Sequence, residues 1–132
     1  MIEPTSQFES SIPPEASSDS RGWAVAAHLT PWIAGFLGPL IIWLAKKEDP
    51  FVEEHARESL NFQLSLMLYF FVWMITFVLI FWIPIWFFVW IPVFFGLAIL
   101  GFVTNIVGAI RASNGEMYRY PLCIRFVSPP RW

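Results

Sequence analysis

Ionisable side chains are scarce in this 132-residue sequence, because Asp, Glu, Lys and Arg make up only 14% of it, against about 25% in an average soluble domain. The stretch from Ser59 to Ile110 contains none of these residues and no His, and Gly22 to Ala45 contains only His28. Hydrophobic residues reach 57% and aromatic residues 19%. A chain of this size cannot bury so many apolar side chains in its own interior, which excludes a soluble globule and predicts a membrane protein.

The sequence also has little cysteine and no recognisable catalytic motif. Cys123 is the only cysteine, which excludes an internal disulfide and a multi-cysteine metal site. The sequence has no metalloprotease, phosphate-loop, nucleophile-elbow or dinucleotide-binding motif. We therefore expect no enzymatic activity, no metal, no cofactor and no nucleic-acid partner.

What the sequence does contain is long apolar segments. A helix needs about 20 residues to cross a hydrocarbon core of about 30 Å, which predicts three spans, at about residues 22–45, 60–82 and 88–111. Pro84 and Pro92 interrupt helical hydrogen bonding, and the tryptophans around them favour the membrane–water interface. We therefore place a turn at residues 83–88, so that the second and third spans form an antiparallel hairpin.

The ends of the chain differ from this apolar part. Residues 1–21 are rich in Ser, Pro and acidic side chains, and we expect them to be disordered. Residues 128–132 form a short C-terminal tail. The sequence thus predicts an all-α membrane domain over residues 22–127, surrounded by lipid.

The basic residues predict an orientation in the inner membrane. Seven of the eight Lys and Arg residues lie in the 46–58 connection or beyond Ile110, so the positive-inside rule places that connection and the C-terminus in the cytoplasm. A straight first span then leaves the N-terminus outside. The alternative is a re-entrant first segment, broken at Pro31, Gly35, Gly38 and Pro39, which would bring the N-terminus to the basic side. We favour the straight crossing.

Polar residues recur on one face of the second span. Asp49 and Pro50 are typical of a helix start, and at 100° per residue the helix that follows aligns Glu54, Glu58, Asn61 and Ser65, with Tyr69 and Thr76 further along. The third span has a face of small and polar residues, Gly101, Thr104, Asn105, Gly108, Ala109 and Ala112. We expect these faces to make helix–helix contacts, within the chain or between copies. A polar-lined cavity is the alternative.

The two histidines are candidate functional residues, because an ionisable group inside a membrane is costly and often has a function. His55 and Glu58 are three residues apart, and His28 lies in the first segment. Metal binding or proton transfer would require these three side chains to converge within about 5 Å, given metal–ligand distances near 2 Å. Because only two histidines exist, we expect structural or interfacial roles for both.

The segment from Tyr118 to Phe126 alternates between two kinds of side chain. Tyr120 shares one face with apolar neighbours, whereas Arg119 and Arg125 lie on the other, which predicts an extended strand. Such a strand would anchor the chain at the interface, through aromatic and Arg contacts with lipid, or would pair with another copy or another protein.

Several ordered motifs carry a resemblance to a known family. The chain resembles a family of small prokaryotic membrane proteins of unknown function that is grouped with the Tic twenty-like proteins of the chloroplast inner envelope. The matching motifs are Ala27-His28-Leu29, Gly38-Pro39-Leu40-Ile41-Ile42-Trp43-Leu44, Lys47-Glu48-Asp49-Pro50-Phe51-Val52, His55 to Gln63, Tyr118-Arg119-Tyr120-Pro121 and Ile124-Arg125-Phe126. The resemblance implies a role in protein–protein association, and its chloroplast relatives imply a relation to a preprotein-import channel.

The functional hypothesis is a non-enzymatic membrane scaffold or accessory subunit that binds other membrane proteins or further copies of itself. The alternative is an oligomeric channel or transporter-like component related to protein import. The direction in which Asn61, Ser65, Thr104 and Asn105 point distinguishes the two. A conduit requires them to line a water-accessible space, whereas a scaffold requires them to hold segments of the chain together.

Overall fold

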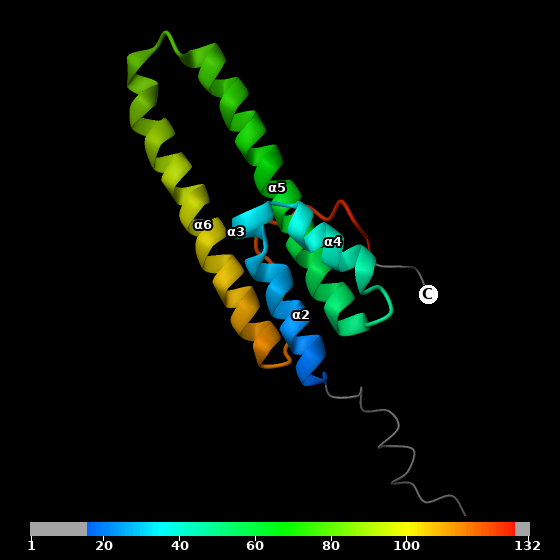
Figure 1. Cartoon of the computed structure of the whole chain (residues 1–132). Helices are drawn as coiled ribbons and strands as arrows, with labels where there is room; N and C mark the ends of the chain where they lie inside the picture. Colours follow the sequence, from blue (N-terminus) through cyan, green and yellow to red (C-terminus); the bar gives the residue numbers. More distant parts are fainter. Residues whose placement is uncertain (1–15, 129–132) are drawn as a thin grey trace, which may run out of the picture.

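The computed structural model describes residues 16–128, and every regular element in this part of the chain is helical. A long pair of helices forms the body of the molecule, and shorter helices cover one end of it (Figure 1). The elements in order are α2 (Ser18–Leu29), α3 (Pro31–Ala34), α4 (Leu37–Ala45), α5 (Pro50–Ile80), the 3-10 helix η1 (Pro84–Trp86) and α6 (Phe87–Ser113).

Helix α5 begins where its sequence predicts. The Asp49 carboxylate accepts hydrogen bonds from the backbone N–H groups of Phe51 and Val52, and Pro50 occupies the first helical turn, where its missing N–H costs nothing. The helix ends at Ile80, shortly before Pro84, and η1 and α6 then return along it. The expected start at Pro50 is confirmed.

The two long helices are the elements that could cross a membrane. Within the described residues, Pro50–Ile80 and Pro84–Ser113 are long and apolar enough to do so. They run in opposite directions, and the centroids of the Trp73 and Trp90 rings lie 3.9 Å apart between them. Most side chains in the half near the turn are exposed and apolar, which fits a lipid environment.

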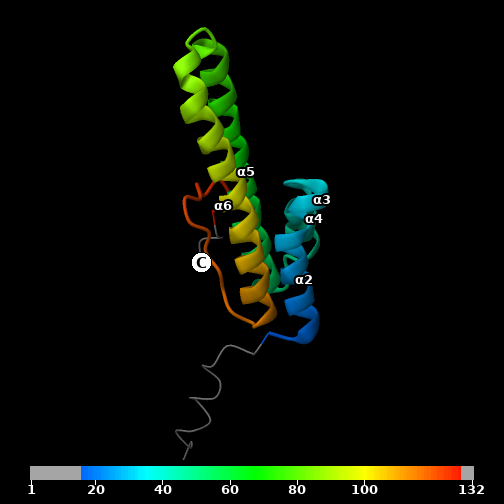
Figure 2. The same ribbon diagram turned by 90° about the vertical axis from the view of Figure 1, so that its left-hand side faces the viewer.

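The first apolar segment is not one helix, which corrects the expected straight span at 22–45. It consists of α2, α3 and α4, and α4 turns back along α2 so that both lie at the same end of the long pair (Figures 1 and 2). Pro31 interrupts helical hydrogen bonding after α2, and Gly35 adopts φ +57°, a left-handed conformation that favours glycine. At Gly38, a Cβ would lie 2.4 Å from Thr30 Oγ1, so glycine permits the close return.

The N-terminal boundary also differs from expectation. Helix α2 begins at Ser18, because the Ser17 side chain accepts a hydrogen bond from the Ser20 backbone N–H and caps the helix. The last four residues of the predicted disordered tail, 1–21, are therefore helical. Residues 1–15 of that tail lie outside the described residues, as do residues 129–132 of the predicted C-terminal tail.

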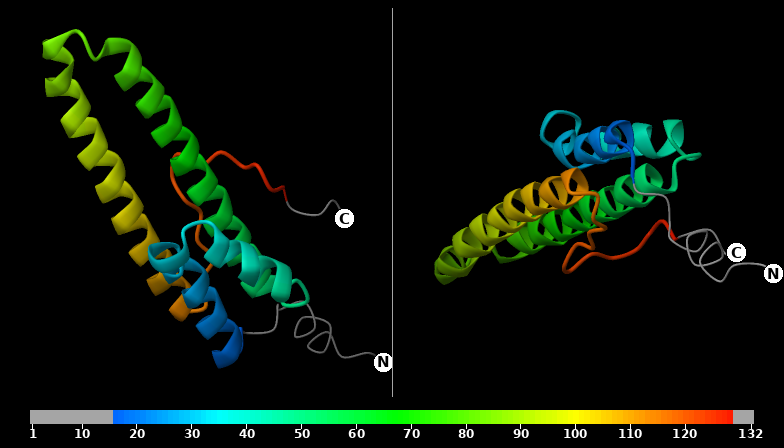
Figure 3. Two further views of the ribbon diagram at one scale, coloured as in Figure 1. Left: turned by 45° about the horizontal axis from the view of Figure 1, so that its top comes forward. Right: turned by 90° about the horizontal axis from the view of Figure 1, so that it is seen from below.

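The segment after α6 forms neither the predicted strand nor a helix. It runs back along the long pair to about half its height, turns near Leu122 and returns (Figure 2). Seen from below, α2–α4 lie on one face of the α5–α6 pair and this segment lies on the other (Figure 3). The predicted strand was wrong because no other strand within residues 16–128 offers it a ladder of hydrogen bonds.

Candidate functional site

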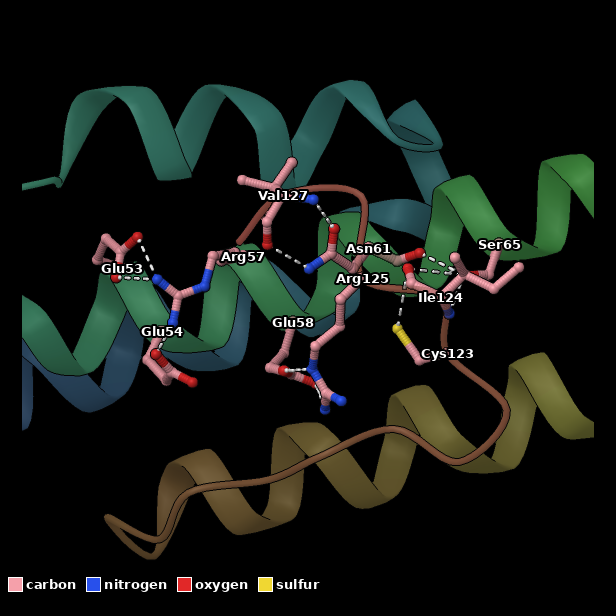
Figure 4. A network of polar contacts seen from close by, with 10 residues as sticks. All are labelled: Glu53, Glu54, Arg57, Glu58, Asn61, Ser65, Cys123, Ile124, Arg125 and Val127. Carbon is pink, nitrogen blue, oxygen red and sulfur yellow. Dashed lines mark hydrogen bonds and ion pairs between the residues drawn. The ribbon is translucent and has the colours of Figure 1, made fainter. Parts of the chain in front are cut away.

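The polar face of α5 holds the C-terminal segment. The Asn61 side chain donates to the Val127 carbonyl oxygen at 2.9 Å and accepts from the Val127 N–H at 2.7 Å (Figure 4). Ser65 Oγ accepts from the Ile124 N–H at 2.7 Å. One turn further on, the Tyr69 hydroxyl donates to the Leu122 carbonyl oxygen at 2.6 Å. Three side chains of α5 therefore bind the backbone of residues 122–127.

This arrangement has a physical reason if α5 lies in a membrane. Backbone N–H and C=O groups without partners are costly in lipid, and irregular backbone is tolerated there only where protein satisfies it. Asn61, Ser65 and Tyr69 supply those partners. The predicted polar face is thus real, but its partner is an irregular segment of the same chain instead of another helix.

Ion pairs extend the network toward the start of α5. Arg125 donates to the buried Glu58 carboxylate, with Nε 3.1 Å from Oε1. Buried Arg57 pairs with Glu53 at 3.0 Å and also with Glu54 (Figure 4). These contacts neutralise the charged groups closest to the apolar part of α5, which lowers the cost of burying them.

A second network links the two ends of the chain. His28 Nδ1 lies 2.5 Å from the Tyr120 hydroxyl, which in turn donates to Asn105 Oδ1 at 2.9 Å. His28 Nε2 lies 2.9 Å from His55 Nδ1, and both imidazoles are fully buried. His28 contacts His55 of α5 and lies against Gly108 of α6. Tyr120 likewise contacts Phe62 of α5 and Asn105 of α6, so the two side chains meet between the long helices.

The three groups proposed for metal or proton chemistry do not form one cluster. His28 and His55 contact each other, whereas Glu58 pairs with Arg125. Among residues 16–128, no group of three His, Cys, Asp or Glu side chains could hold a metal ion. The geometry is that of a buried hydrogen-bonded core.

The small and polar face of α6 packs against α2, α5 and Tyr120. A Cβ at Gly108 would lie 2.6 Å from His28 Nδ1, and a Cβ at Gly101 would lie 3.2 Å from Leu66 Cδ1. Thr104 donates to the Leu100 carbonyl oxygen of its own helix at 2.5 Å. Asn61, Ser65 and Asn105 therefore bond to other segments of the chain, whereas Thr104 bonds only to its own helix.

Two side chains that pack in this buried core, Ser59 and Phe62, were not among the predicted site residues. Ser59 Oγ donates to the Ala27 carbonyl oxygen at 2.7 Å, and Phe62 stacks on the Tyr120 ring with centroids 4.2 Å apart. Both lie on the same face of α5 as His55, at spacings of four and seven residues. This helical spacing in the sequence could have predicted that both residues share the buried face of His55. Conversely, the predicted candidate Arg119 is exposed.

Two ionisable side chains of the C-terminal segment have a raised pKa. Burial raises the pKa of the Cys123 thiol above its usual value, and burial also raises the pKa of the Tyr120 hydroxyl. Both groups are therefore protonated at neutral pH. A protonated Tyr120 is the form that donates to Asn105.

Comparison with known proteins corrects the expected relationship. No curated protein and no solved structure matches the chain. Residues 19–127 match MamF/MmsF, described as the magnetosome magnetite crystal formation protein family. The resemblance to Tic twenty-like proteins was wrong, and the import function that it implied loses its basis. The match includes every described helix except the first residue of α2, as well as both polar networks, and the chain belongs to the magnetosome magnetite crystal formation protein family.

Proposed function

We propose that this protein is a non-enzymatic accessory component of magnetite crystal formation that resides in the magnetosome membrane. The family match over residues 19–127 carries the proposal, because it includes both candidate spans and the networks that hold the ends of the chain. The polar side chains of these networks bind one another or the backbone of this chain. Such an arrangement favours an architectural role over chemistry at a reactive centre.

The proposed topology has two spans and two re-entrant segments. Helix α5 and the η1–α6 unit cross the bilayer, whereas α2–α4 and the C-terminal segment enter and leave from one side. Ser20 Oγ donates to Asp49 Oδ2 at 2.5 Å, which supports placing the starts of α2 and α5 on the same side. The end of α6 is also there, since Gly115, two residues after α6, lies beside the Arg21 side chain.

This topology also favours an orientation. Both ends of the described chain and the 46–58 connection lie on one side, so the seven Lys and Arg residues among residues 16–128 belong to that side and none to the 81–86 turn. The positive-inside rule then places both termini in the cytoplasm. The N-terminus therefore changes side relative to the straight-span expectation.

A gene-replacement experiment in a magnetite-forming host tests the function. Cells that lack this protein are complemented with the wild-type gene, with Asn61→Ala/Ser65→Ala, or with the control Thr76→Ala, whose hydroxyl bonds only the Val72 carbonyl oxygen of its own helix. We expect the double variant to leave magnetite crystals smaller or misshapen in electron micrographs and the control to restore them. Normal crystals in the deletion strain would refute the proposal.

A further inference from the structure

The two halves of the molecule have different cross-sections. Toward the ends of the chain, three layers are stacked, formed by α2–α4, the α5–α6 pair and the C-terminal segment (Figure 3). Toward the 81–86 turn, only α5 and α6 remain (Figures 1 and 2). Under the proposed two-span topology, on which this inference rests, the halves occupy opposite leaflets.

Contacts along α6 give the depth of the N-terminal layer. The centroid of the Trp32 ring, at the start of α3, lies 4.5 Å from that of the Phe102 ring. Phe102 precedes Arg111, the last charged residue of α6, by nine positions, which corresponds to about 14 Å along a helix axis. Half of a hydrocarbon core is about 15 Å. The α2–α4 layer therefore reaches to about the depth of the bilayer midplane.

The C-terminal layer reaches the same depth from the other face. Its innermost contact joins the Leu122 carbonyl oxygen to Tyr69. Tyr69 follows Ser59, the first residue of the uncharged part of α5, by ten positions, which corresponds to about 15 Å. Both extra layers thus lie in one leaflet.

The outer surface of the N-terminal layer is suited to lipid. Ile33, Leu37, Ile41 and Leu44 are exposed. At the level of the headgroups, Lys46 Nζ lies 4.6 Å from the Trp23 ring centroid and Lys47 Nζ lies 4.6 Å from that of Trp43. Trp and Lys favour this boundary. The layer therefore displaces lipid in its own leaflet.

In the opposite leaflet, no additional layer surrounds the α5–α6 pair. There α5 and α6 leave an apolar groove with a volume of about 500 Å³ on one face, lined by residues that include Val72, Trp73, Val89 and Val93. Lipid chains fit this lining. With a helix diameter of about 10 Å, the two additional helices alone add on the order of 150 Å² to one leaflet.

From this asymmetry we infer that the protein recognises membrane curvature, and that it concentrates where the leaflet on the side of its termini is convex. Convex bending spreads the headgroups of that leaflet and makes room for the additional layers, whereas the concave leaflet accommodates the narrow α5–α6 pair. The recognised partner is a curved lipid surface. On a vesicle, the termini face outward.

Vesicles of graded size test this inference. The full chain with a fluorescent C-terminal tag is reconstituted into phosphatidylcholine–phosphatidylglycerol vesicles with diameters from about 50 to about 400 nm, and a membrane-impermeant quencher reports which tags face outward. We expect outward-facing tags per lipid to be at least about twofold denser on the smallest vesicles than on the largest. Equal density at all sizes, or enrichment of inward-facing tags, would overturn the inference.

Two further measurements distinguish a failure of the curvature inference from a failure of the proposed topology. Extraction at alkaline pH and protease protection of tags at both termini report whether the chain is integral with both termini on one side. If the chain is integral with both termini on one side, and the density of outward-facing tags does not vary with vesicle size, only the curvature inference fails. Lysophosphatidylcholine added to the outer leaflet of large vesicles should raise outward insertion there, and no effect would also count against the inference.

Discussion

Asn61 and Val127 exchange two hydrogen bonds, one in each direction, although one residue contributes its side chain and the other its backbone. The Asn61 amide thus behaves toward Val127 as a residue of a neighbouring β-strand would. Only Asn and Gln side chains carry a donor and an acceptor in this arrangement. The Asn61 amide therefore fixes the end of the C-terminal segment, beside the contacts that Ser65 and Tyr69 make with the same segment.

Replacement of Asn61 by Ala should release the segment. Both backbone groups of Val127 lose their partner, at a cost of about 1–3 kcal/mol. Release exposes Cys123 and lowers its pKa toward the usual value, because burial is the main cause of the rise. We expect maleimide to alkylate Cys123 several-fold faster in the variant at pH 7.5, measured by mass spectrometry.

Thr76→Ala is the matched control, because its hydroxyl bonds only its own helix. Its Cys123 should react at the wild-type rate. Equal alkylation of Asn61→Ala and wild type would show that the amide does not hold the segment.

The Glu58–Arg125 pair should respond asymmetrically to mutation. The Glu58 side chain is 3% exposed and Arg125 is 40% exposed, so Arg125→Ala leaves a buried carboxylate without a counter-charge. We expect a loss of about 1–3 kcal/mol, discounted for the exposure of Arg125. Glu58→Gln leaves an exposed guanidinium and should cost less. Thermal unfolding in detergent of both single variants and the double variant measures the coupling, and equal losses would contradict the burial argument.

Two glycines of α6 should differ sharply when replaced by Ala. At Gly108 the added Cβ would lie 2.6 Å from His28 Nδ1, whereas nothing lies within 4 Å of a Cβ at Gly96. Gly108→Ala should therefore lower the melting temperature by several degrees, about 1–3 kcal/mol in stability. Gly96→Ala should leave it unchanged or raise it, since Ala favours helix by about 1 kcal/mol. A similar loss for both would mean that α2 is not packed on α6 as described.

Alkaline pH should weaken the link between the two ends of the chain. Burial raises the pKa of Tyr120 in the folded state, so the neutral hydroxyl stabilises the fold fully below the unfolded pKa of about 10. This contribution is lost as pH rises from there toward the folded pKa. Tyr120→Phe keeps the stacking on Phe62 and has no proton to lose. We expect the stability of wild type to decline more steeply above pH 10 than that of the variant, followed by tryptophan fluorescence, and parallel declines would argue against a buried hydroxyl.

The sequence was informative where one residue acts locally. Asp49 and Pro50 start α5 because capping depends on a few neighbouring atoms, and the polar face of α5 follows from helical periodicity alone. Hydropathy cannot distinguish a straight segment from one that returns, so Pro31 and Gly35 left two arrangements open. The decision depends on distant contacts such as Gly38 with Thr30 and His28 with Tyr120.

The C-terminal segment illustrates the same limit. Alternation at residues 118–126 predicted a strand, whereas the segment is irregular and turns at Pro121 and Leu122. The hydrogen-bond partner of such a segment is a tertiary property. Side chains of α5 fill the role expected of a strand. No local pattern in the segment encodes that choice.

The contact between His28 and Tyr120, 92 positions apart, sets an order for biogenesis. When the ribosome has made the first helices, the residue that completes their packing has not yet been synthesised. The packing of α2 is therefore complete only after α6 and Tyr120 have been synthesised. A nascent chain truncated before Tyr120 would leave His28 without this partner, so quality-control proteases would encounter an unfinished beginning whenever the end is missing.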